Sequence, residues 1–88
     1  MGFRYDPAKA AVNVEKHGVS FADAEGVFGD PLAIAIEDPD ARGEPRYIAI
    51  GLGNLGELLV VVYTEQAGEY RLISARHATR KERKAYEG

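Results

Sequence analysis

The chain has 88 residues, of which 45% are hydrophobic and 28% are charged, as in an ordinary globular protein. This length is sufficient for one hydrophobic core, so we expect a single domain over residues 1–88. It lacks cysteine, which excludes a disulfide framework and a thiolate metal site. Two histidines alone argue against a structural zinc site, and we expect neither metal nor cofactor. The net charge of −3 argues against a general nucleic-acid-binding protein. The longest apolar run, residues 58–63, is far too short to cross a bilayer. The lack of cysteine fits a cytoplasmic protein, which is what we expect.

The first third of the chain predicts a short strand followed by two helices. Residues 3–5 alternate in the manner of a strand with an aromatic face. Asp6 can cap a helix in which Pro7 takes the first position, and Gly18 is placed to end that helix. Ser20 then caps a second, shorter helix, so two helices meet at a corner.

The remainder predicts a sheet and a last helix. Alternating or continuous apolar patterns predict strands over residues 32–37, 46–51, 57–65 and 70–76. Thr79 and Glu82 form a capping box at the start of the terminal helix. The element order is therefore β-α-α-β-β-β-β-α. Its short links predict an α+β fold with an antiparallel sheet and the helices packed on one face.

One glycine motif has two interpretations. Gly51, Gly53 and Gly56 match the spacing of a dinucleotide-binding fingerprint. That fingerprint needs a helix directly after it, to offer free backbone N–H groups to a pyrophosphate. A strand pattern follows here instead, so we predict a hairpin turn.

Positive charge is concentrated at the C-terminal end. Residues 71–88 hold six of the eleven lysines and arginines and two acidic residues, a net charge of +4, against −7 for the first 70 residues. This asymmetry favours a phosphate-bearing or acidic partner. Arg76 and Arg80 lie near the start of the last helix, where free N–H groups favour anions. The alternative is that Arg80 and Arg83 form surface ion pairs of little energetic value. Without a bulge, Arg71 and Arg76 would lie on opposite faces of their strand.

A polar stripe on the first helix is a second candidate site. Lys9, Asn13, Lys16 and His17 are spaced to share one side of that helix. His17 is suited to general acid or base catalysis by its unperturbed pKa of about 6.5. A histidine at a helix C-terminus can equally serve as a cap, because its cation meets the negative end of the dipole.

Several motifs, taken together, resemble the BrnT toxin family over nearly the whole chain. They are Phe3-x-Tyr5-Asp6-x-x-Lys9-x-x-x-Asn13-x-x-Lys16-His17-Gly18-Val19-x-Phe21, Val27-Phe28-x-Asp30-Pro31, Glu44-x-Arg46-x-x-x-Ile50-Gly51, Leu58-Leu59-Val60-Val61-Val62-x-Thr64 and Arg71-x-Ile73-Ser74-Ala75-Arg76-x-Ala78-Thr79-x-x-Glu82-Arg83-x-x-Tyr86. The resemblance implies a RelE-like α+β fold and an endoribonuclease toxin of a type II toxin–antitoxin pair. It also implies a BrnA-type antitoxin as protein partner, an RNA substrate, and contact with operator DNA only through the antitoxin.

The resemblance and the basic residues suggest one mechanism. Cleavage of RNA without a metal needs a base for the 2′-OH, an acid for the leaving oxygen and cations for the charged phosphorane. We expect charge stabilisation from four arginines, Arg46, Arg71, Arg76 and Arg80. Lys9 and His17 of the first helix are candidates for proton transfer or for holding the substrate backbone. Further RNA contacts are expected from Lys16, Asn13, Arg83 and Tyr70 or Tyr47, the tyrosines by stacking on a base.

The alternative is a non-catalytic module that binds an antitoxin or nucleic acid through its basic C-terminus. A concave site that holds Arg71 or Arg76 together with Lys9 or His17 would favour the enzyme. Dispersal of these residues over unrelated faces would favour the module.

Overall fold

The computed structural model describes residues 2–88, so Met1, which the predicted domain includes, lies outside the described residues. The observed elements are β1 (Gly2–Arg4), α1 (Pro7–His17), α2 (Phe21–Ala24), the 3-10 helix η1 (Glu25–Gly29), β2 (Ile34–Glu37), β3 (Tyr47–Leu52), β4 (Leu58–Gln66), β5 (Glu69–His77) and α3 (Arg80–Glu87). The predicted α+β class and element order are confirmed, with the second helix continuing as the 3-10 turn η1.

Within residues 2–88 the strands form a single five-stranded sheet in the order β1-β5-β4-β3-β2. The links between β2, β3, β4 and β5 give antiparallel pairs, as predicted. The prediction of an antiparallel sheet is wrong for β1, which pairs parallel to β5 with Phe3 opposite Tyr70. A short link fixes the direction of the strands it joins, but β1 is separated from the other strands by α1, α2 and η1. Its position is set by packing, since the ring of Phe3 lies 5.2 Å from that of Phe28 and 5.7 Å from that of Tyr70.

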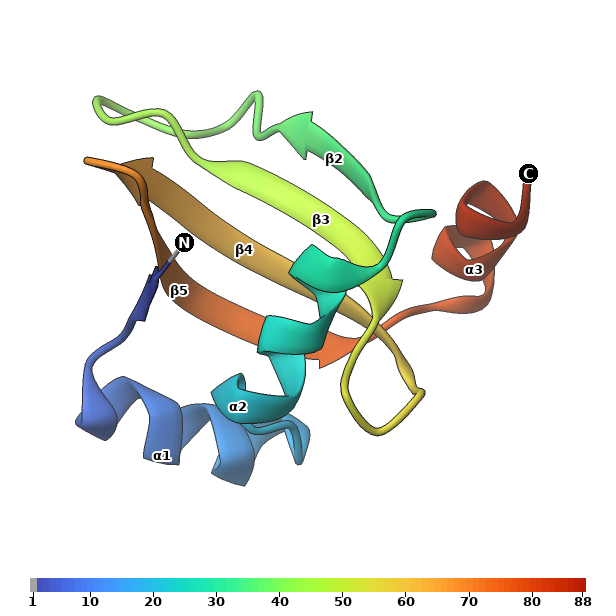
Figure 1. Ribbon diagram of the computed structural model, residues 1–88, viewed down its shortest axis with the longest axis horizontal. Helices are drawn as coiled ribbons and strands as arrows, with labels where there is room; N and C mark the ends of the chain where they lie inside the picture. Colours follow the sequence, from blue (N-terminus) through green and yellow to red (C-terminus); the bar gives the residue numbers. More distant parts are fainter. Residues whose placement is uncertain (1) are drawn as a thin grey trace.

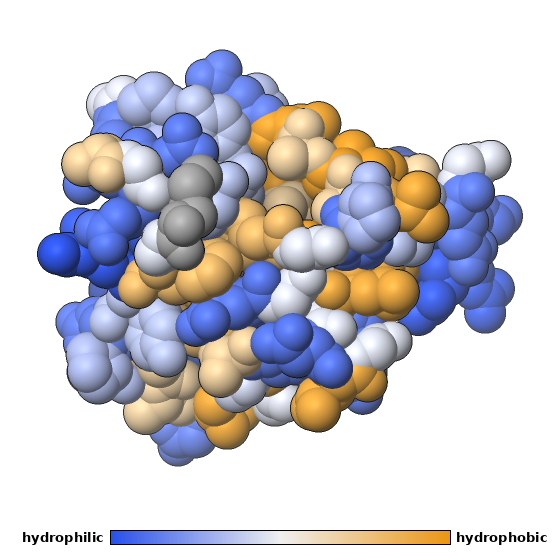
Figure 2. Space-filling model, viewed as in Figure 1, coloured by the Kyte–Doolittle hydropathy of each residue, from blue (hydrophilic) through white to orange (hydrophobic). Residues whose placement is uncertain are grey.

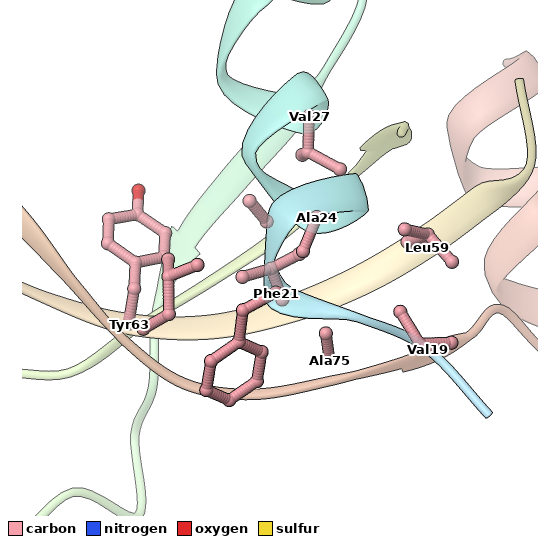
Figure 3. Packing of buried hydrophobic residues seen from close by; sticks show 10 residues of the cluster. Val19, Phe21, Ala24, Val27, Leu59, Tyr63 and Ala75 are labelled. Atoms are coloured by element: carbon pink, nitrogen blue, oxygen red, sulfur yellow. The ribbon is translucent and has the colours of Figure 1, made fainter. Parts of the chain in front are cut away.

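The hydrophobic core lies between the sheet and the α2–η1 segment (Figures 1 and 3). Phe21 and Val27 of this segment and Leu59 of β4 all belong to this core, and each is 1% exposed or less. Each large apolar side chain buried in this way stabilises the fold by about 1.5–3 kcal/mol. Pairing places Tyr47, Tyr63 and Leu72 on the same face of the sheet. We call the other face of the sheet, turned away from α2 and η1, the open face.

Helix α1 begins and ends as predicted but is attached by a polar side chain. The Asp6 carboxylate accepts a hydrogen bond from the Ala8 N–H at 2.8 Å, and Gly18 ends the helix with a left-handed φ of 68°. Asn13 is the buried residue of this helix. Its Nδ2 donates to the carbonyl oxygens of Val19 and Ala75, both at 2.8 Å, and its Oδ1 accepts from the Ala75 N–H at 3.1 Å. Asn13 therefore ties α1 to both the following loop and β5.

A β-bulge in β5 changes which side chains share a face. Tyr63 pairs with Leu72 whereas Val62 pairs with Ser74, so Ile73 is an extra residue between two ladder positions. The extra residue reverses the alternation, and Arg71 and Arg76 both lie on the open face. The prediction that they lie on opposite faces, made for an unbulged strand, does not hold.

Helix α3 is separate from the other helices, so the prediction that the helices share one face is wrong for α3. Figure 1 shows it beyond the end of β3, away from α1. Its predicted capping box is confirmed, with Thr79 Oγ1 accepting from the Glu82 N–H and a Glu82 oxygen accepting from the Thr79 N–H. No residue of Arg80–Glu87 is buried, so α3 contributes no side chain to the hydrophobic core.

The Gly51–Gly56 motif forms the β3–β4 hairpin turn, as predicted. The turn packs against α2: the Asp23 carboxylate accepts from the Leu55 N–H at 2.8 Å and the Asp23 carbonyl accepts from the Asn54 N–H at 3.0 Å. A Cβ on Gly53 would lie 2.7 Å from Asp23 Oδ1 and 2.7 Å from Leu59 Cδ1. Close packing, rather than ligand binding, accounts for that glycine.

Candidate functional site

The open face carries a row of cationic side chains across three neighbouring strands and the segment before β3. Arg4 of β1 pairs with Arg71 of β5, and Arg71 pairs with Thr64 of β4. Arg46 directly precedes Tyr47, which faces the helices and pairs with Tyr63, so alternation places Arg46 on the open face beside Thr64. We call Arg4, Arg71, Thr64 and Arg46 the cationic row.

Two arginines of the cationic row are available to a ligand. Arg4 is paired with Glu69, with Nε and Oε1 2.8 Å apart. Arg46 and Arg71 are exposed and form no salt bridge within the described residues 2–88. Exposed guanidinium groups without an acidic partner can bind a phosphate through two hydrogen bonds.

Thr64 lies between these two arginines and carries an unsatisfied hydroxyl. Its residue is 7% exposed, and its Oγ1 is buried without a hydrogen-bond partner among the residues that the structure describes. Such a group costs about 1–3 kcal/mol relative to a satisfied one. Buried unsatisfied groups are uncommon in native proteins and call for a structural or functional reason.

Arg76 lies farther along the open face and is neutralised within the chain. Its guanidinium forms two 2.8 Å hydrogen bonds with the Glu82 carboxylate and a third, of 3.2 Å, with the His77 carbonyl. The hydrogen bonds from Arg76 hold the pKa of Glu82 at about 2, and the same pair raises the pKa of Arg76. The side chain of Arg76 is still 41% exposed, so one side of it faces solvent.

The polar stripe of α1 borders a groove of about 300 Å³ beside the β5 bulge. Its lining includes Lys9, Lys16 and His17 from α1 and Ile73 and Ser74 from β5. The lysines and His17 are exposed, and Lys16 and His17 occupy the last turn of α1, where a cation is favoured by the helix dipole. Both the helix-cap and the chemical interpretation of His17 therefore stand.

The predicted residues are divided between two adjoining regions. Arg71 and Arg76 flank Ser74 on the open face, and Ser74 also lines the α1 groove with Lys9 and His17. The α1 groove is lined by neither Arg71 nor Arg76, and the pocket that Arg71 lines includes neither Lys9 nor His17. The candidate site is therefore two adjoining regions, the open face and the α1 groove, which meet at the bulged part of β5.

The other predicted residues either lie apart from the cationic row or have their polar groups hydrogen-bonded within the chain. Tyr70 stacks on Phe28 with ring centroids 4.4 Å apart, and Tyr47 lies 5.6 Å from Tyr63, so both tyrosines face the helices. Asn13 is 5% exposed and uses its amide within the chain. Arg80 and Arg83 are exposed on α3, with Arg83 Nη1 4.0 Å from Glu87 Oε2.

The family of the chain follows from comparison with known proteins. Residues 5–82 match the family model described as "Ribonuclease toxin, BrnT, of type II toxin-antitoxin system". The chain belongs to the BrnT family. The resemblance found in the sequence motifs is thus confirmed, and the chain is a ribonuclease toxin of a type II system by family.

The fold agrees with this BrnT assignment. The crystal structure of the Brucella abortus ribonuclease toxin, BrnT, superposes with a TM-score of 0.67 at 28% sequence identity, covering 91% of this chain and 99% of that chain. A comparison with curated proteins gives no match. The BrnT match includes Arg46, Thr64, Arg71 and Arg76, whereas Arg4 and Arg83 lie outside its bounds.

Sequence reasoning missed Thr64 as a site residue and Glu82 as the partner of Arg76. Thr64 is a polar residue at the end of a long apolar run, which was the available signal, but its position between two arginines depends on strand register. Glu82 was interpreted as a capping residue, which it is, and its second contact crosses from helix to strand. Among residues 2–88, no helix has both the length and the apolar character needed to span a membrane.

Proposed function

We propose that this BrnT-family chain is a metal-independent endoribonuclease that acts in the cytoplasm and is neutralised by a BrnA-type antitoxin. On this proposal its fold is RelE-like, and operator DNA is contacted only through the antitoxin. The observation that carries the proposal is the pair of unengaged arginines, Arg46 and Arg71, on either side of the unsatisfied Thr64 hydroxyl. A phosphate diester bound between these arginines would have two cations beside its oxygens. The Thr64 hydroxyl, which is enclosed in the free chain, would be uncovered on binding and would donate to one of those oxygens.

Phosphate binding at the cationic row supplies the electrostatic part of the reaction. In RNA cleavage the 2′-oxygen attacks the adjacent phosphorus, the bond to the 5′-oxygen breaks, and a 2′,3′-cyclic phosphate and a 5′-hydroxyl are formed. Charge builds up on the non-bridging oxygens during the attack. Arg46 and Arg71 would stabilise that charge, and the Thr64 O–H would donate to one of the oxygens. Arg80 would extend the cationic surface toward α3, Arg76 would offer the exposed side of its Glu82-paired guanidinium to the substrate, and Arg83 would contact the RNA backbone.

Proton transfer is assigned to the α1 groove. Lys9 and His17 lie there beside Ser74, next to the strand that carries Arg71. One would remove the proton from the 2′-OH and the other would protonate the leaving 5′-oxygen, while Lys16 would contact the backbone. Asn13 would act by holding α1 against β5, and Tyr70 by supporting β5 from the helix-facing side.

The test is cleavage of a defined RNA by the purified chain, with and without EDTA. Arg71→Ala, Arg76→Ala and His17→Ala should each reduce the rate at least tenfold, and EDTA should leave it unchanged. Arg42→Ala is the matched control, because Arg42 is an exposed arginine in the β2–β3 loop, outside the cationic row. Full activity in all three folded variants would reject this site assignment. Lack of cleavage by the wild-type chain would favour the non-catalytic module.

A further inference from the structure

The open face has an aliphatic half next to the cationic row. On β2 and β3, Ile34 pairs with Ile50 and Ile36 pairs with Ile48. Ile48 and Ile50 in turn pair with Val62 and Val60, which lie on the open face with Thr64. We call Ile34, Ile36, Ile48 and Ile50 the isoleucine patch. Ile36 is 56% exposed, and Leu32, just before β2, is 70% exposed.

The isoleucine patch does not belong to the core of this chain. The core cluster lies on the opposite face, beneath α2 and η1. Figure 2, which views the molecule from the side of α2 and η1, shows hydrophobic residues along the edge of the molecule where Figure 1 places β2. A contiguous apolar surface of this kind is a mark of protein–protein contact. RNA sites instead use cations and aromatic or arginine planes on which bases stack, and the isoleucine patch offers neither.

Strand β2 also offers backbone groups to a partner. It is an end strand of the sheet, paired to β3 along one side. The N–H and C=O groups on its other side can pair with an added strand, which would bring alternate side chains onto the isoleucine patch.

The surrounding charge defines the chemistry of the partner. Arg46 and Arg71 lie on the same face, and α3 contributes four exposed cations: Arg80, Lys81, Arg83 and Lys84. A partner that covers the isoleucine patch must therefore combine aliphatic with acidic side chains. A second copy stacked on this face would oppose arginines to arginines, which like-charge repulsion disfavours.

We propose that the isoleucine patch and the free edge of β2 bind the antitoxin, through an extended segment whose aliphatic residues cover the patch and whose continuation crosses the open face with acidic residues toward the cationic row. This rests on the proposed function, because the segment would neutralise the toxin by covering the phosphate site. Bound there, the acidic residues occupy Arg46 and Arg71 in place of RNA. Toxin activity and antitoxin binding thus use two halves of one sheet face.

The test is to change the isoleucine patch without changing the cationic row. The probe is the purified cognate antitoxin protein, and the readouts are its Kd and the rate of RNA cleavage. Ile36→Glu should weaken antitoxin binding at least thirtyfold, because it places a carboxylate against an acidic, aliphatic partner. Ile36→Gln should weaken it about fivefold to tenfold through lost apolar contact. Both variants should still cleave RNA and should need more antitoxin for inhibition.

Val14→Glu is the matched control, because Val14 is a similarly exposed aliphatic residue, 48% against 56%, but lies on α1. It should leave the antitoxin Kd within twofold, and thermal unfolding should show that all variants are folded. An unchanged Kd in Ile36→Glu, or an equal loss in Val14→Glu, would overturn the proposal.

Two other occupants give different results. A wild-type dimer in light scattering that becomes monomeric in Ile36→Glu, with antitoxin affinity unchanged, would make the isoleucine patch a contact between copies and overturn the proposal. A tenfold loss of cleavage in Ile36→Gln at unchanged antitoxin affinity would assign the patch to RNA and overturn it as well. If the wild-type chain does not cleave RNA, the proposed function fails, yet the antitoxin affinities still decide the docking surface.

Discussion

Arg76 and Glu82 join the last strand to the last helix through two hydrogen bonds of 2.8 Å each, Nη1 to Oε1 and Nη2 to Oε2. Glu82 Oε1 also accepts from the Thr79 N–H at 2.8 Å, so one carboxylate both caps α3 and neutralises Arg76. Because no residue of Arg80–Glu87 is buried, these contacts and the hydrogen bond of 2.6 Å from the Tyr86 O–H to Asp30 Oδ2 have a large share in positioning α3.

The first prediction concerns the pH dependence that Glu82 gives to stability. Its pKa of about 2 in the folded chain lies below the ordinary 4.5, so the carboxylate stabilises the fold fully above pH 4.5 and loses this contribution as the pH falls toward 2. Glu82→Gln should therefore lower the free energy of unfolding by about 1 kcal/mol at pH 7, a value reduced by the partial exposure of the pair. The difference from wild type should shrink between pH 4.5 and pH 2, measured by urea unfolding at each pH.

Glu87→Gln is the control for that experiment. Glu87 faces Arg83 at 4.0 Å and both side chains are more than half exposed, so its removal should change stability by less than about 0.5 kcal/mol at any pH. Equal effects of the two substitutions at pH 7 would contradict the special role of Glu82.

The second prediction separates stability from activity at Thr64. Thr64→Val keeps the shape of the side chain and removes the buried unsatisfied hydroxyl. Stability should stay the same or rise by up to about 1 kcal/mol, since no hydrogen bond within the described residues is lost. RNA cleavage should nevertheless fall about tenfold, if the hydroxyl donates to the substrate phosphate. A stable variant with unchanged cleavage would remove Thr64 from the site, whereas a loss of stability would show that its hydroxyl has a partner in the free protein.

The third prediction concerns Asn13, which the sequence suggested as an RNA contact and the structure shows in a structural position. Asn13→Ala removes three hydrogen bonds and leaves the Ala75 N–H without its acceptor. The free energy of unfolding should drop by about 2–4 kcal/mol. The melting temperature should fall by roughly 10 °C or more.

Asn54→Ala is the matched control for Asn13. The amide of Asn54 makes a single exposed hydrogen bond, to the Ala22 carbonyl at 2.9 Å, so its loss should cost about 0.5–1 kcal/mol. If Asn13→Ala were no more destabilising than Asn54→Ala, α1 would have to be held to the sheet by other contacts.

What the sequence predicted well was decided by neighbouring residues. The caps at Asp6, Ser20 and Thr79 and the turn at Gly51–Gly56 all depend on groups within a few positions of each other. Local geometry leaves few options there, and each of these predictions is confirmed.

What the sequence did not predict depends on residues far apart in the chain. The parallel pairing of β1 follows from where Phe3 packs, and the Ile73 bulge decides that Arg71 and Arg76 share a face. A one-residue insertion leaves the apolar pattern of β5 almost unchanged, yet it reverses the side of every later residue. The sequence therefore suggests which residue types form the candidate site, but not how they are placed relative to one another.

The last prediction tests the packing of the hairpin turn against α2. Gly53→Ala places a Cβ 2.7 Å from Asp23 Oδ1 and 2.9 Å from the Asp23 carbonyl oxygen. Either the turn or α2 must shift, which should lower stability by about 1–3 kcal/mol. Gly29→Ala is the control, because nothing lies within 4 Å of its added Cβ, and it should leave stability unchanged or raise it by up to about 1 kcal/mol. Urea unfolding of the two variants gives the comparison. Equal stability would mean that the turn moves freely away from α2, and the hydrogen bonds from Leu55 and Asn54 to Asp23 could then contribute little to holding β3 and β4 beneath η1.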